Sequence, residues 1–560
     1  MPYSPAHAAP CSLRLLGRRC AALALAAVLL AVAAQADEPE PTQLAALVGD
    51  GTPPVSAGPV TTMALAAALG HLPPGVRPPE GTVILREERG TYGPRLIEQL
   101  PVTAPGGGAP YEIEYTVDPT IDAEMRAVLA EKEVTLGHVI LMDPHTGEVF
   151  SYVSTDPTVF PATGTYPTAS LMKVVTAAAV LQHAPRAAKR NCRWDGNPWI
   201  VEEEQLEPPE TGGRLDSLAD SLAISNNQCF ARLAVHDLGE KKLVREMEVA
   251  GLFEPPAAHH LPGRVEEIED DLALGYLGSG LGGSFVSPMA AARLAALFAS
   301  GNLVQPYWVA RVRDARGQLL ANPPHPAPES VWPEPVAHSL RQWMIDVTAR
   351  GTAKSAFRDE EGVPLLGDIA VAGKTGTLRG TEPEGRYQWF IGLAPAEAPR
   401  LAISAVVVNE EGMSSAAQVA GAALARLFCF EGTCHPARVE RLHWRSRERD
   451  RATASELATQ RAAREIAALK PHPRPRLLGQ PVLDFPPRLR RRPVTGEMRL
   501  RIGLATSGNV VRAEVLDSGL PTRFSPVVLR QVRGWQFSQT YEDGEAIERT
   551  FEFPIRISIE

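Results

Sequence analysis

Apolar and polar positions recur with two different periods along the chain, and these periods mark the predicted elements. Between residues 121 and 132, apolar residues stand three and four positions apart, which predicts an amphipathic helix. An apolar run over 137–142 and the segment 148–153 are joined by a turn, so they predict two paired strands. Further helices are predicted over 170–181, 215–236 and 287–300, and further strands over 369–374, 387–393 and 401–408. Strands before and after a group of helices predict an α+β fold, an antiparallel sheet with flanking helices.

The C-terminal part of the chain has a strand periodicity of its own. Every second residue is apolar from Met498 to Leu504 and again from Phe551 to Ile559. A short helix is predicted over 527–532 and another strand over 535–537. The pattern therefore predicts a small separate α+β domain over 474–560. The charged segment 438–473 ahead of it predicts a helical linker, broken by a proline-rich stretch.

The N-terminus has the pattern of an export signal. Arg14, Arg18 and Arg19 precede an apolar run over 20–34, and Ala-Gln-Ala then precedes acidic residues. This pattern predicts a signal peptide over 1–36, with a retained inner-membrane anchor as the alternative. Residues 37–112 are rich in proline and glycine and predict a lead-in segment that carries no motif.

Export changes the interpretation of the cysteines, because disulfides persist in oxidising compartments. Two cysteines would leave with the signal. The mature chain would keep four cysteines: Cys192, Cys229, Cys429 and Cys434. The last two are close enough to clip a loop, so they are predicted to pair, and the first two would form the other disulfide. No second Cys-x-x-Cys accompanies them, and no metal site is predicted.

Composition and charge exclude several classes of protein. Hydrophobic residues make up 44% of the chain and charged residues 22%, which is typical of a globular protein. The net charge of −9 argues against a general nucleic-acid binder. No apolar run reaches about 20 residues, which excludes a polytopic membrane protein. Residues 436–495 hold 15 Lys and Arg against 6 Asp and Glu, which fits either a solvated linker or contact with an anionic surface.

Ser170 and Lys173 form an S-x-x-K motif at the beginning of the helix predicted over 170–181. Residues three positions apart share a helix face, so the Lys173 amine can reach the Ser170 hydroxyl. A serine hydroxyl needs an adjacent base to be a nucleophile, and a lysine among apolar side chains can lose its charge and act as that base. By itself the motif is weak, because the spacing recurs by chance.

A K-T-G-T motif is predicted to end the apolar strand over 369–374. Because side chains alternate along a strand, Lys374 and Gly376 are expected on one face, and Thr375 and Thr377 on the other. Gly376 lets a substrate backbone lie against the strand, and Lys374 supplies a cation that can hold a carboxylate.

The order of three motifs makes coincidence improbable. Ser225 and Asn227 form S-x-N, which begins 55 residues after Ser170, and K-T-G begins 149 residues after Ser225. The same ordered triple, with aspartate in place of Asn226, is typical of penicillin-binding proteins and class A β-lactamases.

Residues from about 113 to 430 resemble the transpeptidase domain of penicillin-binding proteins. That family belongs to the serine D,D-peptidase and β-lactamase superfamily. The whole domain is predicted over 113–437. The resemblance also rests on TVDPTIDAEMRAVL, GHVILMDPHTGEVFSYV, RGTAKSAF and YQWFIGLAP. No glycosyltransferase motif precedes this region, and the E-x-x-L-N motif of one β-lactamase class is absent.

This resemblance implies a role for each motif residue. It implies Ser170 as the acylated nucleophile, Lys173 as its base, Ser225 as a proton relay, Asn227 as a binder of the substrate amide, Lys374, Thr375 and Thr377 as binders of the substrate carboxylate, and the N–H groups of Ser170 and Thr377 as the oxyanion hole.

Residues 474–560 resemble the periplasmic C-terminal domain of TonB-type energy transducers. The matching stretches are PPRL, GEMRLRIGLATSGNVVRAEVLDSG, VRGWQF and FEFPIRISI. The resemblance implies a protein-interaction module in a Gram-negative periplasm. Trp535 would be either an exposed contact residue or part of the core.

The sequence thus predicts a periplasmic serine D,D-transpeptidase or carboxypeptidase that acts on the D-Ala-D-Ala end of peptidoglycan stem peptides through an acyl-serine. The alternatives are a β-lactamase, or a non-catalytic scaffold or β-lactam sensor that works through its C-terminal domain. The predicted partners are stem peptides, β-lactams and a periplasmic protein, with no nucleic acid, cofactor or metal.

Overall fold

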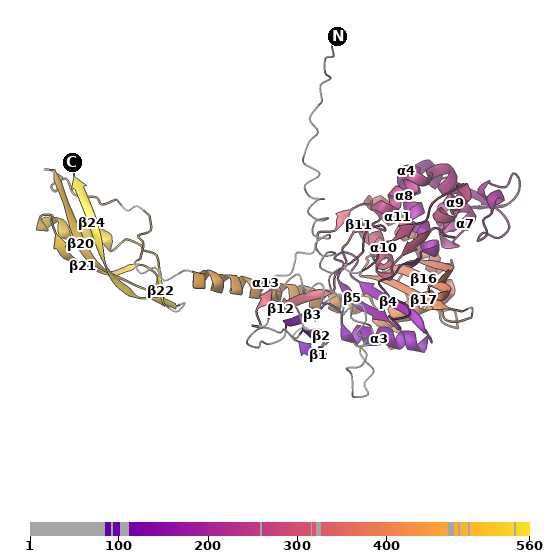
Figure 1. Cartoon of the computed structure of the whole chain (residues 1–560), viewed down its shortest axis with the longest axis horizontal. Helices are drawn as coiled ribbons and strands as arrows, with labels where there is room; N and C mark the ends of the chain where they lie inside the picture. The colour runs from indigo at the N-terminus through magenta and orange to yellow at the C-terminus, as the bar shows by residue number, and fades with distance from the viewer. Residues whose placement is uncertain are drawn as a thin grey trace, which may run out of the picture. The chain divides into compact units, whose positions relative to one another are not determined.

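A computed structural model describes residues 84–90, 93–100, 111–257, 260–314, 316–320, 326–410, 412–468, 475–479, 482–490, 493–542 and 545–559 (Figure 1). The chain divides into two compact units, 1–449 and 450–560. The predicted signal peptide and most of the lead-in segment lie outside the described residues. Among the described residues, no helix combines the length and apolarity that a membrane span requires.

A five-stranded antiparallel sheet forms the centre of the first unit. Its strands lie in the order β15 (Ala372–Thr381), β16 (Glu384–Ala394), β17 (Leu401–Asn409), β4 (Leu136–Met142) and β5 (Val149–Ser154). The inner strands are almost continuously apolar because both faces of the sheet are covered. Along β17, Ala402 and Val406 pack into one core, whereas Ile403 and Val407 pack into another.

Helices lie on both faces of this sheet (Figure 1). One face is covered by α10 (Pro288–Ser300) and α11 (Glu334–Ala349), and the other by α3 (Pro119–Glu131) and α12 (Ala416–Phe428). Helix α4 (Met172–His183) packs against α11 within the first of these layers. The predicted α+β fold with an antiparallel sheet and flanking helices is therefore confirmed.

Smaller elements complete the first unit. The helices are α5 (Pro185–Ala188), α6 (Leu218–Ala223), α7 (Asn227–Arg232), α8 (Glu240–Val249) and α9 (Asp271–Ser279). A second sheet has the order β1 (Ile84–Gly90), β2 (Gly93–Leu100), β3 (Tyr111–Tyr115), β12 (Val309–Arg313) and β13 (Leu319–Leu320). The short strands are β6 (Tyr166–Pro167), β7 (Cys192–Trp194), β8 (Arg214–Asp216), β9 (Arg264–Val265), β10 (Ser284–Val286), β11 (Asn302–Leu303), β14 (Glu329–Ser330), β18 (Cys429–Phe430) and β19 (Thr433–Cys434).

Two predicted elements differ from the structure. The helix expected over 215–236 is interrupted: strand β8 comes first, and α6 and α7 are separated by a bend at Ser225, whose φ is 58°. A left-handed residue cannot continue a helix, and sequence periodicity does not register it. The strand expected over 369–374 begins at Ala372 instead, so K-T-G-T lies near the beginning of β15 and not at its end.

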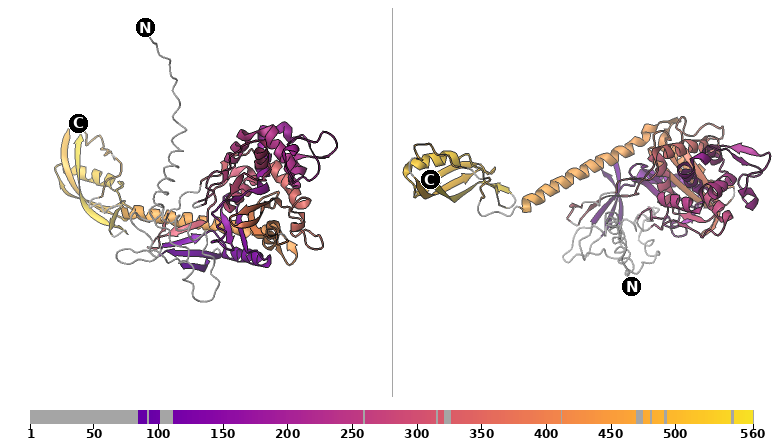
Figure 2. Two further views of the ribbon diagram at one scale, coloured as in Figure 1. Left: turned by 45° about the vertical axis from the view of Figure 1, so that its right-hand side comes forward. Right: turned by 90° about the horizontal axis from the view of Figure 1, so that it is seen from above.

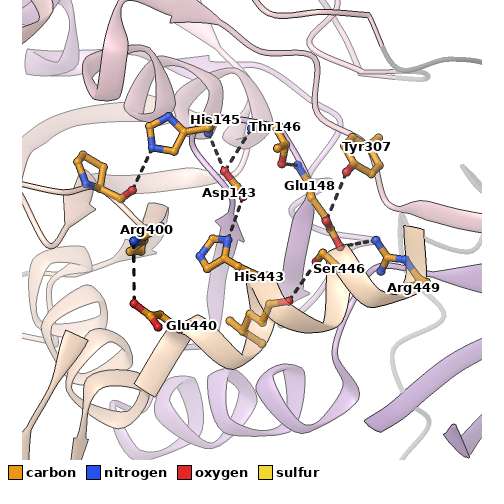
Figure 3. A network of polar contacts seen from close by, with 12 residues as sticks. Asp143, His145, Thr146, Glu148, Tyr307, Arg400, Glu440, His443, Ser446 and Arg449 are labelled. Carbon is orange, nitrogen blue, oxygen red and sulfur yellow. Dashed lines mark hydrogen bonds and ion pairs between the residues drawn. The ribbon is translucent and has the colours of Figure 1, made fainter. Parts of the chain in front are cut away.

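Helix α13 (Glu440–Ala468) was expected to be a linker, but its first turns pack against the first unit (Figure 3). His443 Nδ1 lies 3.0 Å from Asp143 Oδ2, and Arg449 donates to Glu148 at 2.8 Å. Both carboxylates are buried at the turn between β4 and β5. Residues 440–449 therefore belong to the packed body of the first unit and not to a free spacer.

The second unit has a core of its own. Its sheet has the order β21 (Val510–Ser518), β20 (Val494–Leu504) and β24 (Arg549–Ile559), and α14 (Ser525–Val532) packs against it (Figure 2). A two-stranded sheet pairs β22 (Thr540–Glu542) with β23 (Glu545–Ile547). The alternating positions of β20 are buried as predicted, and Trp535 is a core residue. The strand expected over 535–537 is reduced to isolated bridges.

Candidate active site

Ser170 lies in a single 3-10 turn, Ala169–Leu171, directly before helix α4. Ala169 has a φ of 52°, a left-handed conformation that costs a non-glycine residue about 1–2 kcal/mol. Two glycines approach this turn closely. A Cβ added to Gly280 would lie 2.0 Å from the Ala169 carbonyl oxygen, and one added to Gly376 would lie 3.4 Å from the Ser170 nitrogen. This packing fixes the position of the Ser170 backbone.

The fully buried Lys173 amine contacts three oxygen atoms. Its Nζ lies 2.8 Å from Ser170 Oγ, 2.5 Å from Asn227 Oδ1 and 2.5 Å from the Ser279 carbonyl oxygen. Burial, and then the nearby charge of Lys374, hold the pKa of Lys173 well below its ordinary value. A neutral lysine has two N–H bonds and one lone pair. Because the amide and carbonyl oxygens can only accept, they take the two N–H bonds and leave the lone pair to the Ser170 hydroxyl.

The second motif stands at the bend between α6 and α7. The side chain of Asn226 accepts a hydrogen bond from the Cys229 N–H at 3.2 Å and so caps helix α7. Asparagine and aspartate are about equally good N-cap residues, so Asn226 keeps the local structure that an aspartate would give. Asn227, the first residue of α7, is thereby turned toward Lys173, while Ser225 is turned toward Lys374.

Lys374 connects the second motif with the third. Its fully buried amine donates to Ser225 Oγ at 3.0 Å and to the Thr375 carbonyl oxygen at 2.7 Å. Burial lowers the pKa of Lys374 to about 7. Burial alternates along β15 as predicted, since Lys374 and Gly376 are buried and Thr377 is exposed. Within the described residues, β15 is an edge strand of the central sheet, so part of its backbone is available to an added strand.

The structure thus brings all three motifs together. Lys173 joins Ser170 to Asn227, and Lys374 joins Ser225 to the K-T-G strand. This arrangement was expected from the order of the motifs, although no single motif could show it.

Three groups beside the motifs were not singled out from the sequence. The Ser279 carbonyl accepts from Lys173, the Trp199 carbonyl accepts from Asn227 Nδ2 at 2.6 Å, and Thr352 Oγ1 lies 2.6 Å from Thr375 Oγ1. Thr352 belongs to the RGTAKSAF stretch, so the resemblance contained a signal for it. The other two act through backbone oxygens, which no residue type reveals.

Both predicted disulfides are present in the structure. Cys192 is bonded to Cys229, the third residue of helix α7, and Cys429 is bonded to Cys434 just after the end of α12. Among the described residues, no group of three or more His, Cys, Asp or Glu side chains is placed to hold a metal ion.

The site therefore combines a serine hydroxyl that faces a buried lysine with an edge strand that carries a second buried lysine. Residues 137–428, about half of the chain, match the family described as "Penicillin binding protein transpeptidase domain". The chain therefore belongs to the penicillin-binding protein transpeptidase family, and the prediction of a serine D,D-transpeptidase is confirmed at the level of enzyme class.

Curated relatives and a solved structure match more than half of the chain. The chain is 26% identical over 393 residues to "Peptidoglycan D,D-transpeptidase PbpA" of Mycolicibacterium smegmatis, which covers 62% of this chain and 76% of that protein. It is 27% identical over 379 residues to the protein of the same name from Mycobacterium tuberculosis. That match covers 59% of this chain and 73% of the relative. The crystal structure of PBPA from Mycobacterium tuberculosis is 20% identical, with a TM-score of 0.48, covering 62% of this chain and 96% of that one.

Proposed function

We propose that the protein is a serine D,D-transpeptidase that acts on the D-Ala-D-Ala end of peptidoglycan stem peptides through an acyl-Ser170 intermediate. The observation that carries this proposal is the environment of Lys173. Two acceptor oxygens take its N–H bonds, its burial favours the neutral form, and its lone pair is left for Ser170. The mycobacterial relatives, which are named as peptidoglycan D,D-transpeptidases, support the same activity.

In the acylation step, Ser170 Oγ attacks the carbonyl carbon of the penultimate D-Ala while its proton passes to Lys173 Nζ. The N–H groups of Ser170 and Thr377 would hold the oxyanion, and one such donor typically contributes about 10²–10³ in rate. Collapse of the tetrahedral intermediate breaks the C–N bond. The terminal D-Ala then leaves with a proton relayed from Lys173 by Ser225.

Lys374 has a different task in this mechanism. Its ammonium would bind the carboxylate of the terminal D-Ala, together with the hydroxyls of Thr375 and Thr377. An amine then takes the acyl group to form a cross-link, or water takes it in a carboxypeptidase reaction. Either acceptor restores the Ser170 hydroxyl.

Labelling with a fluorescent penicillin tests the proposal. The wild-type protein should carry a stable label on a denaturing gel, and Ser170→Ala should carry none. A wild-type protein that stays unlabelled at saturating probe would overturn the proposal and favour a scaffold. Rapid loss of the label with turnover of a chromogenic cephalosporin would indicate a β-lactamase.

We also infer that the protein works in the periplasm, where its peptidoglycan substrate lies, and that residues 474–560 bind a protein partner there. The separate core of the second unit supports an independent module. Export is tested by fractionating cells that produce the full chain and by sequencing the N-terminus of the mature protein, which should begin at Asp37.

A further inference from the structure

Residues 192–199, called here the anchoring segment, run alongside the second motif. A disulfide and several hydrogen bonds connect the segment to the motif and to helix α7. The Cys192–Cys229 disulfide ties its first residue to α7. The Asn227 N–H donates to the Pro198 carbonyl at 2.7 Å, and Trp199 Nε1 donates to the Ile224 carbonyl at 3.0 Å. The segment also accepts from side chains of α7, so it is fixed to the helix that carries Asn227.

Gln228 makes the central contact of this group. Its buried side chain donates from Nε2 to the Asp195 carbonyl at 2.8 Å and to the Asn197 carbonyl at 3.0 Å. Asp195, Gly196 and Asn197 are exposed, so no apolar packing holds this part of the segment. The disulfide and Gln228 therefore help to hold Pro198 and Trp199 in place, together with the Asn227–Pro198 and Trp199–Ile224 hydrogen bonds and the pairing of β7 with β8.

The position of the Trp199 carbonyl selects one of the two orientations of the Asn227 amide. A carbonyl oxygen can only accept, so Asn227 must turn Nδ2 toward Trp199 and Oδ1 toward Lys173. If the amide were reversed, its N–H₂ group would face Lys173 and donate to the lone pair of the neutral amine. Ser170 would then lose its base.

We propose that Gln228 and the Cys192–Cys229 disulfide are positioning residues for the general base, because they hold the anchoring segment in the place that orients the Asn227 amide and so aims the lone pair of Lys173 at Ser170. This inference deepens the proposed function and rests on it. Loosening the segment should slow acylation more than it weakens the binding of the β-lactam, since Gln228 and the disulfide have no contact with the ligand in the proposed mechanism and reach it only through Asn227.

The chain offers a matched control, because it has a second disulfide that does not touch the second motif. Stopped-flow acylation by a chromogenic β-lactam gives K, the dissociation constant of the noncovalent complex, and the acylation rate constant k2. For Cys192→Ser/Cys229→Ser, k2 should fall about tenfold and K should change by much less. For Cys429→Ser/Cys434→Ser, both constants should stay at the wild-type values. An unchanged k2 in the first pair, or an equal fall in both pairs, would overturn the inference.

A second variant separates positioning from simple loss of folding. Gln228→Glu keeps the size of the side chain but cannot donate to the two carbonyl groups, so it should lower k2 to a similar extent. Gln228→Glu and the loss of the Cys192–Cys229 disulfide release the same segment. The fall in k2 when both are combined should therefore be clearly smaller than the product of the two separate falls. The inference would be contradicted if the two falls in k2 multiplied fully. It would also be contradicted if the fall in k2 matched the fraction of protein that circular dichroism shows to be unfolded. A wild-type protein that is not acylated at all would instead contradict the proposed function.

Discussion

Two buried lysines stand in the same site, and their partners give them different chemistry. Lys173 faces two acceptor oxygens and one hydroxyl, so these contacts fit its neutral form, as the proposed base requires. Lys374 donates to Ser225 and to its own strand, and burial lowers its pKa to about 7. Its charge is therefore present at lower pH and is lost as the pH rises through about 7.

The binding of carboxylate ligands should depend on that charge. For the wild-type protein, we expect K for a β-lactam to rise as the pH increases from 7 to 9, because the neutral Lys374 amine no longer attracts the carboxylate. Lys374→Arg keeps its charge over this pH range, so its K should not change with pH. Its affinity should be weaker than that of the wild-type protein at pH 7. Stopped-flow measurements of K against pH check this. A flat wild-type profile would mean that Lys374 does not supply the charge.

At the scale of elements, long periodic segments were predicted well and broken ones were not. The apolar spacing of helix α3 follows from the burial of one face, and the apolar runs of α10 and the inner strands follow from burial on all sides. Helix α13 has no such pattern and was expected from its charged, helix-forming composition. The bend at Ser225 and the left-handed Ala169 have no such signal, since neighbouring backbone holds them in place. The motif residues could be predicted from residue type, whereas the carbonyl groups of Ser279 and Trp199 could not.

The turn that carries the nucleophile gives a prediction at this scale. Gly280 has a φ of 72°, and a Cβ there would lie 2.0 Å from the Ala169 carbonyl oxygen, so Gly280→Ala should displace the nucleophile turn. We expect a loss of about 2–4 kcal/mol in the free energy of unfolding and a large fall in k2. Gly282→Ala is the matched control, because nothing lies within 4 Å of its added Cβ. Urea denaturation and acylation kinetics of both variants check this, and equal behaviour of the two would contradict it.

The contact between α13 and the rest of the first unit gives a second prediction at this scale. Arg449 donates to the buried carboxylate of Glu148, so Arg449→Ala would leave a buried charge without this partner. We expect the free energy of unfolding of the first unit to fall by about 3 kcal/mol. Arg447→Ala, at an exposed position of the same helix, should change it by less than about 0.5 kcal/mol. If thermal denaturation shows the same small change for both, the helix contributes little to this unit.

At the scale of the whole molecule, the division into two units has a thermodynamic consequence. Each unit has its own hydrophobic core, so calorimetry of the full chain should show two unfolding transitions. Acylation of Ser170 by a slowly hydrolysed β-lactam should raise the melting temperature of one transition and leave the other unchanged, because only the first unit binds the ligand. A single transition that shifts as a whole would show that the units unfold together.

With the proposed positioning role, formation of the Cys192–Cys229 disulfide would be the step after which Ser170 is acylated at its full rate. Thiols of cytosolic proteins stay reduced, and the two cysteines are 37 residues apart, so a newly made chain in a reducing compartment would carry all three motifs before this bond forms. Such a chain would fold and bind penicillin yet acylate slowly, and oxidation would complete its maturation. Protein produced in the cytoplasm of an ordinary expression host would lack this disulfide. Weak penicillin labelling of that protein would then reflect the missing disulfide and not an inactive site.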